Sequence, residues 1–163
     1  KSELYIVFGA SYIKGWLIKF LIKKSALNLH MGISPYYRGS ACNFWAIYDN
    51  KPQFMGATIH HLSKGLDNGK ILFHALPKTK KYKNNFDFTM NSVLAAQKIL
   101  VKKINNKSIF KIKPIKQDKF KEIRYSKNQE FNNKTIINFL KKNKKFKKPK
   151  YNLNDYINPC FDI

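Results

Sequence analysis

Five side chains suited to acid–base or hydrogen-bonding chemistry gather in two short segments of this sequence. Asn28 and His30 lie two positions apart in the segment NLHMGISPYYRG. Thr58 and His60 repeat this spacing in the segment TIHHLSKGLDNG, where Asp67 follows in a turn flanked by glycines. Residues two apart share a face of an extended segment, and glycines let the turn bring the carboxylate close. An amide donor, a proton carrier and an orienting carboxylate are the groups that acyl transfer through a tetrahedral intermediate requires.

Two alternatives compete with this interpretation of the histidines. A zinc site formed by His30, His60 and Asp67 is the first, but no HxxxH or HxxE pattern supports it, and we expect no metal. The second is a purely structural role. We expect it for His74, an isolated histidine, and for His61, which has the opposite parity to His60 and should face away from the site.

The sequence around these residues predicts strands that alternate with helices. A buried strand over residues 4–8, a helix over residues 12–24 and a strand over residues 26–31 form a βαβ unit. Residues 32–39 form a loop, in which Pro35 prevents an early helix. His30 therefore precedes a loop at the carboxyl end of a strand, where α/β sheets bind their ligands.

Further elements support the α/β class. They are a helix over residues 40–48 with Ser40 as its N-cap, a strand over residues 53–62, a loop over residues 63–70, a strand over residues 71–75 and a helix over residues 89–105.

After residue 105 the hydrophobic pattern is weaker. It predicts a short extended segment over residues 109–115, a final helix over residues 135–142 and a solvated lysine cluster over residues 141–150. We accordingly divide the chain into a core, residues 1–106, and a short basic C-terminal extension, residues 107–163.

Length and composition indicate one globular domain. The 163 residues are 44% hydrophobic and 15% aromatic, and no run of eighteen apolar residues predicts a membrane span. Cys42 and Cys160 are expected to be free thiols in a reducing, cytoplasmic setting. The sequence has no initiator methionine, and a strand pattern begins at once, so we interpret Lys1 as a truncation point.

The net charge of +23 allows two interpretations. Lysines attract phosphate, so the charge could serve nucleic acid or another anionic substrate. However, Arg38 and Arg124 are the only arginines, and Asn, Ile, Phe and Tyr are also abundant. Such joint enrichment is what AT-rich codons produce without selection for binding, and it lacks the guanidinium groups suited to phosphate. We favour codon usage and a solvated surface.

The two segments belong to an ordered series of motifs. These are Asn28-Leu29-His30, Gly32-Ile33-Ser34-Pro35, Tyr37-Arg38-Gly39, Trp45-Ala46-Ile47, Gly56-Ala57-Thr58-Ile59-His60 and Leu66-Asp67-Asn68-Gly69. In order and spacing they resemble the folate-dependent formyltransferases, which act on methionyl-tRNA, glycinamide ribonucleotide or amino-sugar nucleotides. The resemblance covers residues 4 to about 106. It implies the C-terminal portion of a Rossmann-like fold, a mixed and mostly parallel sheet flanked by helices, with the N-terminal half of the fold missing.

The resemblance also implies roles for individual residues. Asn28 would stabilise the oxyanion, His30 would move the proton, and Asp67 would orient the imidazole or a water molecule. Thr58 and His60 would support them. The formyl donor would be 10-formyltetrahydrofolate, with its pterin enclosed near Asp67 and by Ser11, Tyr12, Ile13, Lys14, Gly32, Ile33, Ser34 and Pro35. Met31 departs from the family, which usually has proline at this position.

The acceptor implied by the resemblance is a primary amine, and we favour an amino-sugar nucleotide. The version Ser-Pro-Tyr-Tyr-Arg-Gly-Ser looks closest to amino-sugar or uncharacterised members. The residues after Asn105 carry too few strand and turn signals for the C-terminal β-barrel of a methionyl-tRNA enzyme. Methionyl-tRNA formyltransferase, with tRNA as partner, remains an alternative. Others are a formyltetrahydrofolate hydrolase, an inactive fragment and a basic RNA-binding module; the oligomeric state is not implied.

Overall fold

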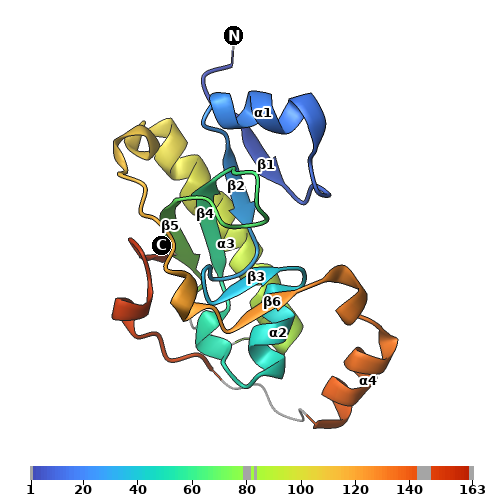
Figure 1. The fold of residues 1–163 in the computed structure, drawn as a ribbon. Coiled ribbons are helices and arrows are strands. Elements are labelled where there is room, and N and C mark those ends of the chain that lie inside the picture. The colour runs from blue at the N-terminus through green and yellow to red at the C-terminus, as the bar shows by residue number, and fades with distance from the viewer. Residues whose placement is uncertain (1, 79–81, 83, 143–147, 162–163) are drawn as a thin grey trace.

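A five-stranded sheet forms the centre of the computed structural model, which describes residues 2–78, 82, 84–142 and 148–161 (Figure 1). Its strands, in spatial order, are β1 (Ile6–Phe8), β2 (Leu27–His30), β4 (Ala57–His61), β5 (Ile71–Leu76) and β7 (Cys160–Phe161). β1 is parallel to β2 and β5 to β7, whereas β4 is antiparallel to both β2 and β5. Four strands therefore share one direction, which confirms the predicted α/β class with a mixed, mostly parallel sheet.

The predicted βαβ unit is present as β1, α1 (Gly15–Lys23) and β2. The helix begins three residues later than predicted, because Lys14 has extended backbone and Gly15 a left-handed φ of 66°. Residues 9–14 therefore form a loop between β1 and α1. This loop lies at the carboxyl end of β1, next to the corresponding end of β2.

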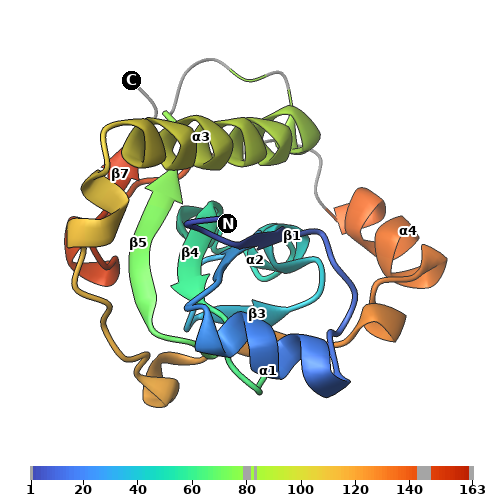
Figure 2. The same cartoon turned by 90° about the horizontal axis from the view of Figure 1, so that it is seen from above.

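One hydrophobic core lies between the sheet and α3 (Asn85–Asn105), which runs along one side of the molecule while α1 lies on the other side (Figure 2). Ala96, Ile99 and Leu100 of α3 pack against strand residues such as Ile59 and Phe73. All six residues of β5 are buried, as expected for an apolar strand covered on both faces. In the described part of the chain, no helix has both the length and the apolar character needed to cross a membrane.

A helix cap and a 3₁₀ turn explain where two elements depart from their predicted bounds. The helix predicted from Thr89 begins at Asn85, because the side chain of Asn84 accepts a hydrogen bond from the backbone N–H of Asp87 (2.9 Å) and caps an additional turn. The strand predicted from residue 53 begins at Ala57, since Pro52–Phe54 forms a 3₁₀ turn.

A second, smaller sheet was not predicted. β3 (Tyr37–Gly39) lies inside the expected loop and pairs in parallel with β6 (Arg124–Ser126) from the C-terminal segment. Arg124 holds both carboxylate oxygens of Asp49, at 3.0 and 2.8 Å, and Asp49 accepts a hydrogen bond from the Tyr37 hydroxyl (3.1 Å). The Tyr37 side chain is fully buried in a second core with α2 (Cys42–Tyr48).

The prediction that Ser40 caps α2 is wrong. Ala41 occupies the N-cap position with a left-handed φ of 53°, and no side chain caps the helix. Ser40 instead belongs to the junction with β6, where its backbone N–H donates to the Ser126 carbonyl (3.0 Å) and its hydroxyl donates to Asn128. Long-range pairing has overridden the local capping preference.

The C-terminal segment also differs from its prediction over residues 108–115. Residues Ser108–Lys111 form a 3₁₀ turn rather than an extended segment, and only Ile115 pairs, with Ile71, through two 2.8 Å backbone hydrogen bonds. The predicted final helix is confirmed as α4 (Asn133–Lys142). Residues 143–147 of the predicted lysine cluster, and Lys1, lie outside the described residues.

Candidate active site

Strand pairing brings together four of the five candidate residues, those that lie on β2 and β4. In the antiparallel register of β2 and β4, Asn28 lies opposite His60, and His30 lies opposite Thr58. The Asn28 amide nitrogen is 3.2 Å from His60 Nε2. The two-residue spacings in the sequence therefore become neighbouring rows on one face of the sheet.

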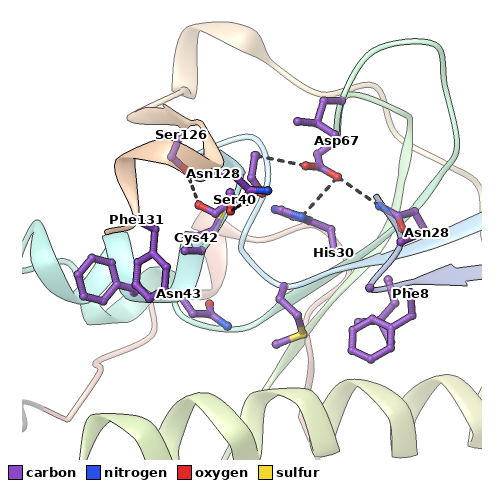
Figure 3. Close-up of a pocket in the computed structure, with 18 of the residues that line it drawn as sticks. Phe8, Asn28, His30, Ser40, Cys42, Asn43, Asp67, Ser126, Asn128 and Phe131 are labelled. Atoms are coloured by element: carbon purple, nitrogen blue, oxygen red, sulfur yellow. Dashed lines mark hydrogen bonds and ion pairs between the residues drawn. The ribbon is translucent and has the colours of Figure 1, made fainter. Parts of the chain in front are cut away.

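Asp67 connects these residues through one carboxylate oxygen (Figure 3). Its Oδ1 accepts a hydrogen bond from Asn28 Nδ2 (3.2 Å) and lies 3.4 Å from His30 Nδ1 and 3.7 Å from His60 Nε2. The other oxygen, Oδ2, accepts from the backbone N–H of Gly39 (3.2 Å). The amide, the imidazoles and the carboxylate thus converge.

Hydrogen-bond partners indicate which imidazole nitrogens carry protons. His60 Nδ1 lies 2.8 Å from the His61 carbonyl and therefore donates, so Nε2 accepts from Asn28. His30 Nε2 lies 3.2 Å from the Tyr37 carbonyl and donates to it. This assignment leaves His30 Nδ1 as the basic nitrogen, beside the Asp67 carboxylate that would stabilise an imidazolium.

Burial and charge act in opposite directions on the two ionisable groups. Burial lowers the pKa of His30, and the neighbouring Asp67 carboxylate only partly offsets this effect. Burial alone would raise the pKa of Asp67, but His30, His60 and the N–H of Gly39 outweigh it and lower that pKa. At neutral pH the site therefore holds a neutral His30 and an ionised Asp67.

We expect His30 to titrate below its ordinary pKa of 6.5, followed by two-dimensional NMR of the imidazole nitrogens. Asp67→Asn should lower the pKa of His30 further, because it removes the anion that favours the imidazolium. His74 serves as an internal reference, since burial lowers its pKa to about 4. A His30 pKa that rises in Asp67→Asn would contradict the proposed contact.

The residues assigned to the pterin by resemblance fall into two groups. Ser11, Tyr12 and Ile13 line a cavity of about 890 Å³, together with Asn28, His30, His60 and Asp67. Lys14, Gly32, Ile33, Ser34 and Pro35 are not among the residues that line it. Thr58, also outside the lining, fixes the loop of residues 32–35, because its hydroxyl donates to the Gly32 carbonyl (2.6 Å) and accepts from the Ser34 N–H (2.9 Å).

Two further loops form the walls of this cavity. Residues 7–13 line one side, and Leu62, Ser63, Gly65 and Leu66 line another. The Tyr12 hydroxyl ties the two loops together by donating to the Lys64 carbonyl (2.9 Å). Apolar residues of α3 and α4, including Met90 and Phe139, complete the wall.

Sequence reasoning assigned no role at the site to several residues that lie near it. The Gln117 amide donates to the Asp67 and Gly69 carbonyls, and Arg38 donates to the Leu66 carbonyl (2.9 Å) while pairing with Glu122 (2.6 Å). Ser126 and its neighbours, residues 125–128, line the cavity from the C-terminal segment. Gln117 lies in a lysine-rich stretch without regular periodicity, so no sequence signal marked it.

The other two histidines behave as structural residues. His74 is fully buried, donates from Nε2 to the Ser34 carbonyl (2.8 Å) and accepts at Nδ1 from the Ile157 N–H (2.9 Å). His61 Nδ1 lies 3.1 Å from the Ser25 carbonyl, outside the cavity. Within the described ranges, no group of three His, Cys, Asp or Glu side chains is arranged to hold a metal ion.

Comparison with known proteins identifies the family. The Formyl transferase family matches residues 11–104, more than half of the chain, and the matched region contains Asn28, His30 and Asp67. The chain therefore belongs to the formyl transferase family.

Two curated relatives are methionyl-tRNA formyltransferases. The protein from Desulforamulus reducens is 35% identical over 72 residues, which cover 44% of this chain and 22% of that protein. The protein from Trichormus variabilis is 25% identical over 117 residues, which cover 72% of this chain and 35% of that protein. The matches therefore span between about a fifth and a third of the length of these relatives.

Solved structures with the same fold include other formyltransferases. A 4-N formyltransferase from Francisella tularensis has a TM-score of 0.66 at 18% identity, and the match covers 96% of this chain and 69% of that one. The formyltransferase PseJ from Anoxybacillus kamchatkensis, solved with UDP-4,6-dideoxy-4-formamido-L-AltNAc and tetrahydrofolate, has a TM-score of 0.63 at 24% identity. That match covers 78% of this chain and 66% of PseJ. At these identities the likeness concerns the fold.

Proposed function

We propose that this chain carries the catalytic residues of an enzyme that transfers a formyl group from 10-formyltetrahydrofolate to a primary amine. The observation that carries the proposal is the convergence of Asn28 and His30 on one oxygen of Asp67, at 3.2 and 3.4 Å. Membership of the formyl transferase family supports the same reaction.

We further propose that residues 1–106 form the catalytic core and residues 107–163 form a C-terminal extension. The free thiols of Cys42 and Cys160 support a reducing, cytoplasmic setting.

The cavity fits a formyl donor of this class. Its volume of about 890 Å³ lies in the range typical of small-molecule sites, roughly 300 to 1,000 Å³. Its walls combine apolar side chains with loops whose peptide groups can hydrogen-bond a polar ring, and Asn28, His30 and Asp67 line the same space. PseJ, one of the structural neighbours, was solved with tetrahydrofolate. When bound, the donor supplies an activated formyl group.

Asn28 is assigned to the oxyanion. When the amine nitrogen attacks the formyl carbon, the carbonyl oxygen gains negative charge, and an amide N–H directed at it stabilises the transition state. In the structure both N–H groups of the Asn28 amide are engaged, one by Asp67 Oδ1 and one by His60 Nε2, each at 3.2 Å, so one of them must turn to the formyl oxygen when the donor binds. His60 is therefore assigned a supporting role, because its Nε2 orients the amide before the donor binds.

His30 and Asp67 are assigned to proton movement. Forming the new carbon–nitrogen bond makes the amine nitrogen acidic, and breaking the bond to the folate nitrogen makes that nitrogen basic. His30 Nδ1 takes up the first proton and returns one to the leaving nitrogen, so its charge is restored at the end of the cycle. Asp67 stabilises the transient imidazolium from 3.4 Å. The products are a formamide and tetrahydrofolate, and no covalent intermediate with the protein is needed.

The favoured acceptor is an amino-sugar nucleotide. The solved sugar N-formyltransferase from Shewanella and the sugar 3N-formyltransferase WlaRD have TM-scores of 0.60 and 0.59, higher than the 0.50 of a methionyl-tRNA formyltransferase from Clostridium thermocellum. The second candidate is methionyl-tRNA, which the curated relatives from Desulforamulus reducens and Trichormus variabilis support. The net charge of +23 suits either anionic acceptor.

An isotope-transfer assay tests both the reaction and the acceptor. The chain is incubated with formyl-labelled 10-formyltetrahydrofolate and either an amino-sugar nucleotide or methionyl-tRNA. We expect label in a formamide on the sugar nucleotide. Label on methionyl-tRNA would select the second acceptor, and release of labelled formate without an acceptor would identify a hydrolase. If none of these occurs in a chain shown to be folded, the proposed transfer by this chain is wrong.

A further inference from the structure

Gln117 lies outside the cavity lining but holds the turn that carries Asp67. It is 8% exposed, and its amide nitrogen donates to two carbonyl oxygens, those of Asp67 (2.9 Å) and Gly69 (2.8 Å). The amide orientation is fixed, because a reversed amide would direct its oxygen at both carbonyls. Its own oxygen, Oε1, has no hydrogen-bond partner among the described residues. Gln117 thus fixes the backbone on both sides of Asn68.

The Asp67 turn needs such support for two reasons. Asp67 has a φ of 48°, in the left-handed region that side chains other than glycine rarely adopt and that persists where the surroundings enforce it. Gly69 approaches the end of β4 so closely that an added Cβ would lie 1.7 Å from the His61 carbonyl oxygen. Small shifts of this turn would therefore move the carboxylate relative to His30.

The position of Gln117 is itself fixed by strand pairing. Two residues earlier, Ile115 exchanges two 2.8 Å backbone hydrogen bonds with Ile71, the first residue of β5. Since the Asp67 turn leads directly into β5, this bridge places Gln117 beside the turn.

We propose that Gln117 is a positioning residue for the reaction: it fixes the Asp67 carboxylate against His30, and so supplies the site with a group from the C-terminal segment. The kinetic part of this inference rests on the proposed function. The geometric part does not, because the effect of Asp67 on His30 can be measured without turnover.

The first test is the titration of His30 in Gln117→Met, which keeps an unbranched side chain but removes both donors. We expect the pKa of His30 to fall, as in Asp67→Asn, because the carboxylate is no longer held beside it. Besides Asp67, the titratable and charged groups that act on His30 are His60 and Arg38, and both remain in the variant. Gln97→Met, an exposed substitution on α3, should leave the titration unchanged. An unchanged His30 pKa in a folded Gln117→Met chain would overturn the inference.

The second test is kinetic. In Gln117→Met we expect kcat for formyl transfer to fall about tenfold, with the KM for the donor near the wild-type value, because Gln117 does not line the cavity.

Gln117→Glu keeps the side-chain shape and can be measured instead if the Met variant does not fold. Its ionised carboxylate would face two carbonyl oxygens, so we expect its defect to lessen as the pH falls and Glu gains a donor proton. Wild-type kcat in either variant would contradict positioning. Absence of transfer in the wild-type chain would instead contradict the proposed function, and the titration would still test Gln117.

Discussion

Replacing His30 with alanine is expected to lower kcat for formyl transfer at least about a hundredfold, the scale of losing a positioned proton carrier. Neither nitrogen of the adjacent His60 is available to replace it. His60 Nδ1 donates to the His61 carbonyl at 2.8 Å, and its Nε2 accepts from Asn28 at 3.2 Å. Single-turnover kinetics with a formyl-labelled donor would measure the effect on the chemical step directly.

His61→Ala is the matched control for this experiment. His61 follows His60 directly, but its ring lies beside the Ser25 carbonyl (3.1 Å) and outside the cavity. We expect its kcat to stay near the wild-type value. If His30→Ala also retained a near wild-type rate, His30 could not be the proton carrier, and the assignment of the site would have to be abandoned.

Replacing Gly39 with alanine is expected to lower the free energy of unfolding by about 3 kcal/mol, the sum of a left-handed backbone penalty and an overpacked contact. Gly39 has a φ of 91°, and an added Cβ would lie 2.1 Å from the backbone oxygen of Ser126. β3 and β6 would have to separate, which would also withdraw the Gly39 N–H from Asp67. Urea unfolding followed by circular dichroism measures the loss.

Gly15→Ala separates the two contributions. Gly15 also has a left-handed φ, 66°, but an added Cβ would meet nothing within 4 Å. Its expected loss is about 1 kcal/mol, from the backbone alone. Equal losses in the two variants would show that β3 and β6 do not approach each other as closely as described.

Local pattern was sufficient to predict the centre of the sheet and the residues that meet there. The apolar run over residues 4–8, the helical spacing around Trp16 and the strand pattern over residues 26–31 identified the βαβ unit. Asn28 and His30 share a face because β structure has a period of two, and this property follows from the sequence without knowledge of neighbouring strands. Glycines around Asp67 marked the turn that brings the carboxylate to them.

Contacts between distant segments could not be predicted in the same way. Ser40 has a good N-cap side chain, yet the Ser126 carbonyl, 86 residues later, determines its conformation. The parallel pairing of β3 with β6 involves three-residue strands, too short to show a period. Gln117 has an ordinary polar side chain, and its role depends on a single bridge between Ile115 and Ile71. Each of these features depends on tertiary packing rather than on local preference.

The dependence of β3 on β6 has a consequence for synthesis of the protein. The reacting groups are all translated by residue 67, but Gln117, Arg124 and Ser126, which hold the surrounding backbone, leave the ribosome about fifty residues later. An emerging chain must therefore close long loops before the carboxylate and the imidazole are fixed against each other. A premature stop codon between residues 68 and 116 would leave every reacting side chain in the product and remove the groups that keep them aligned.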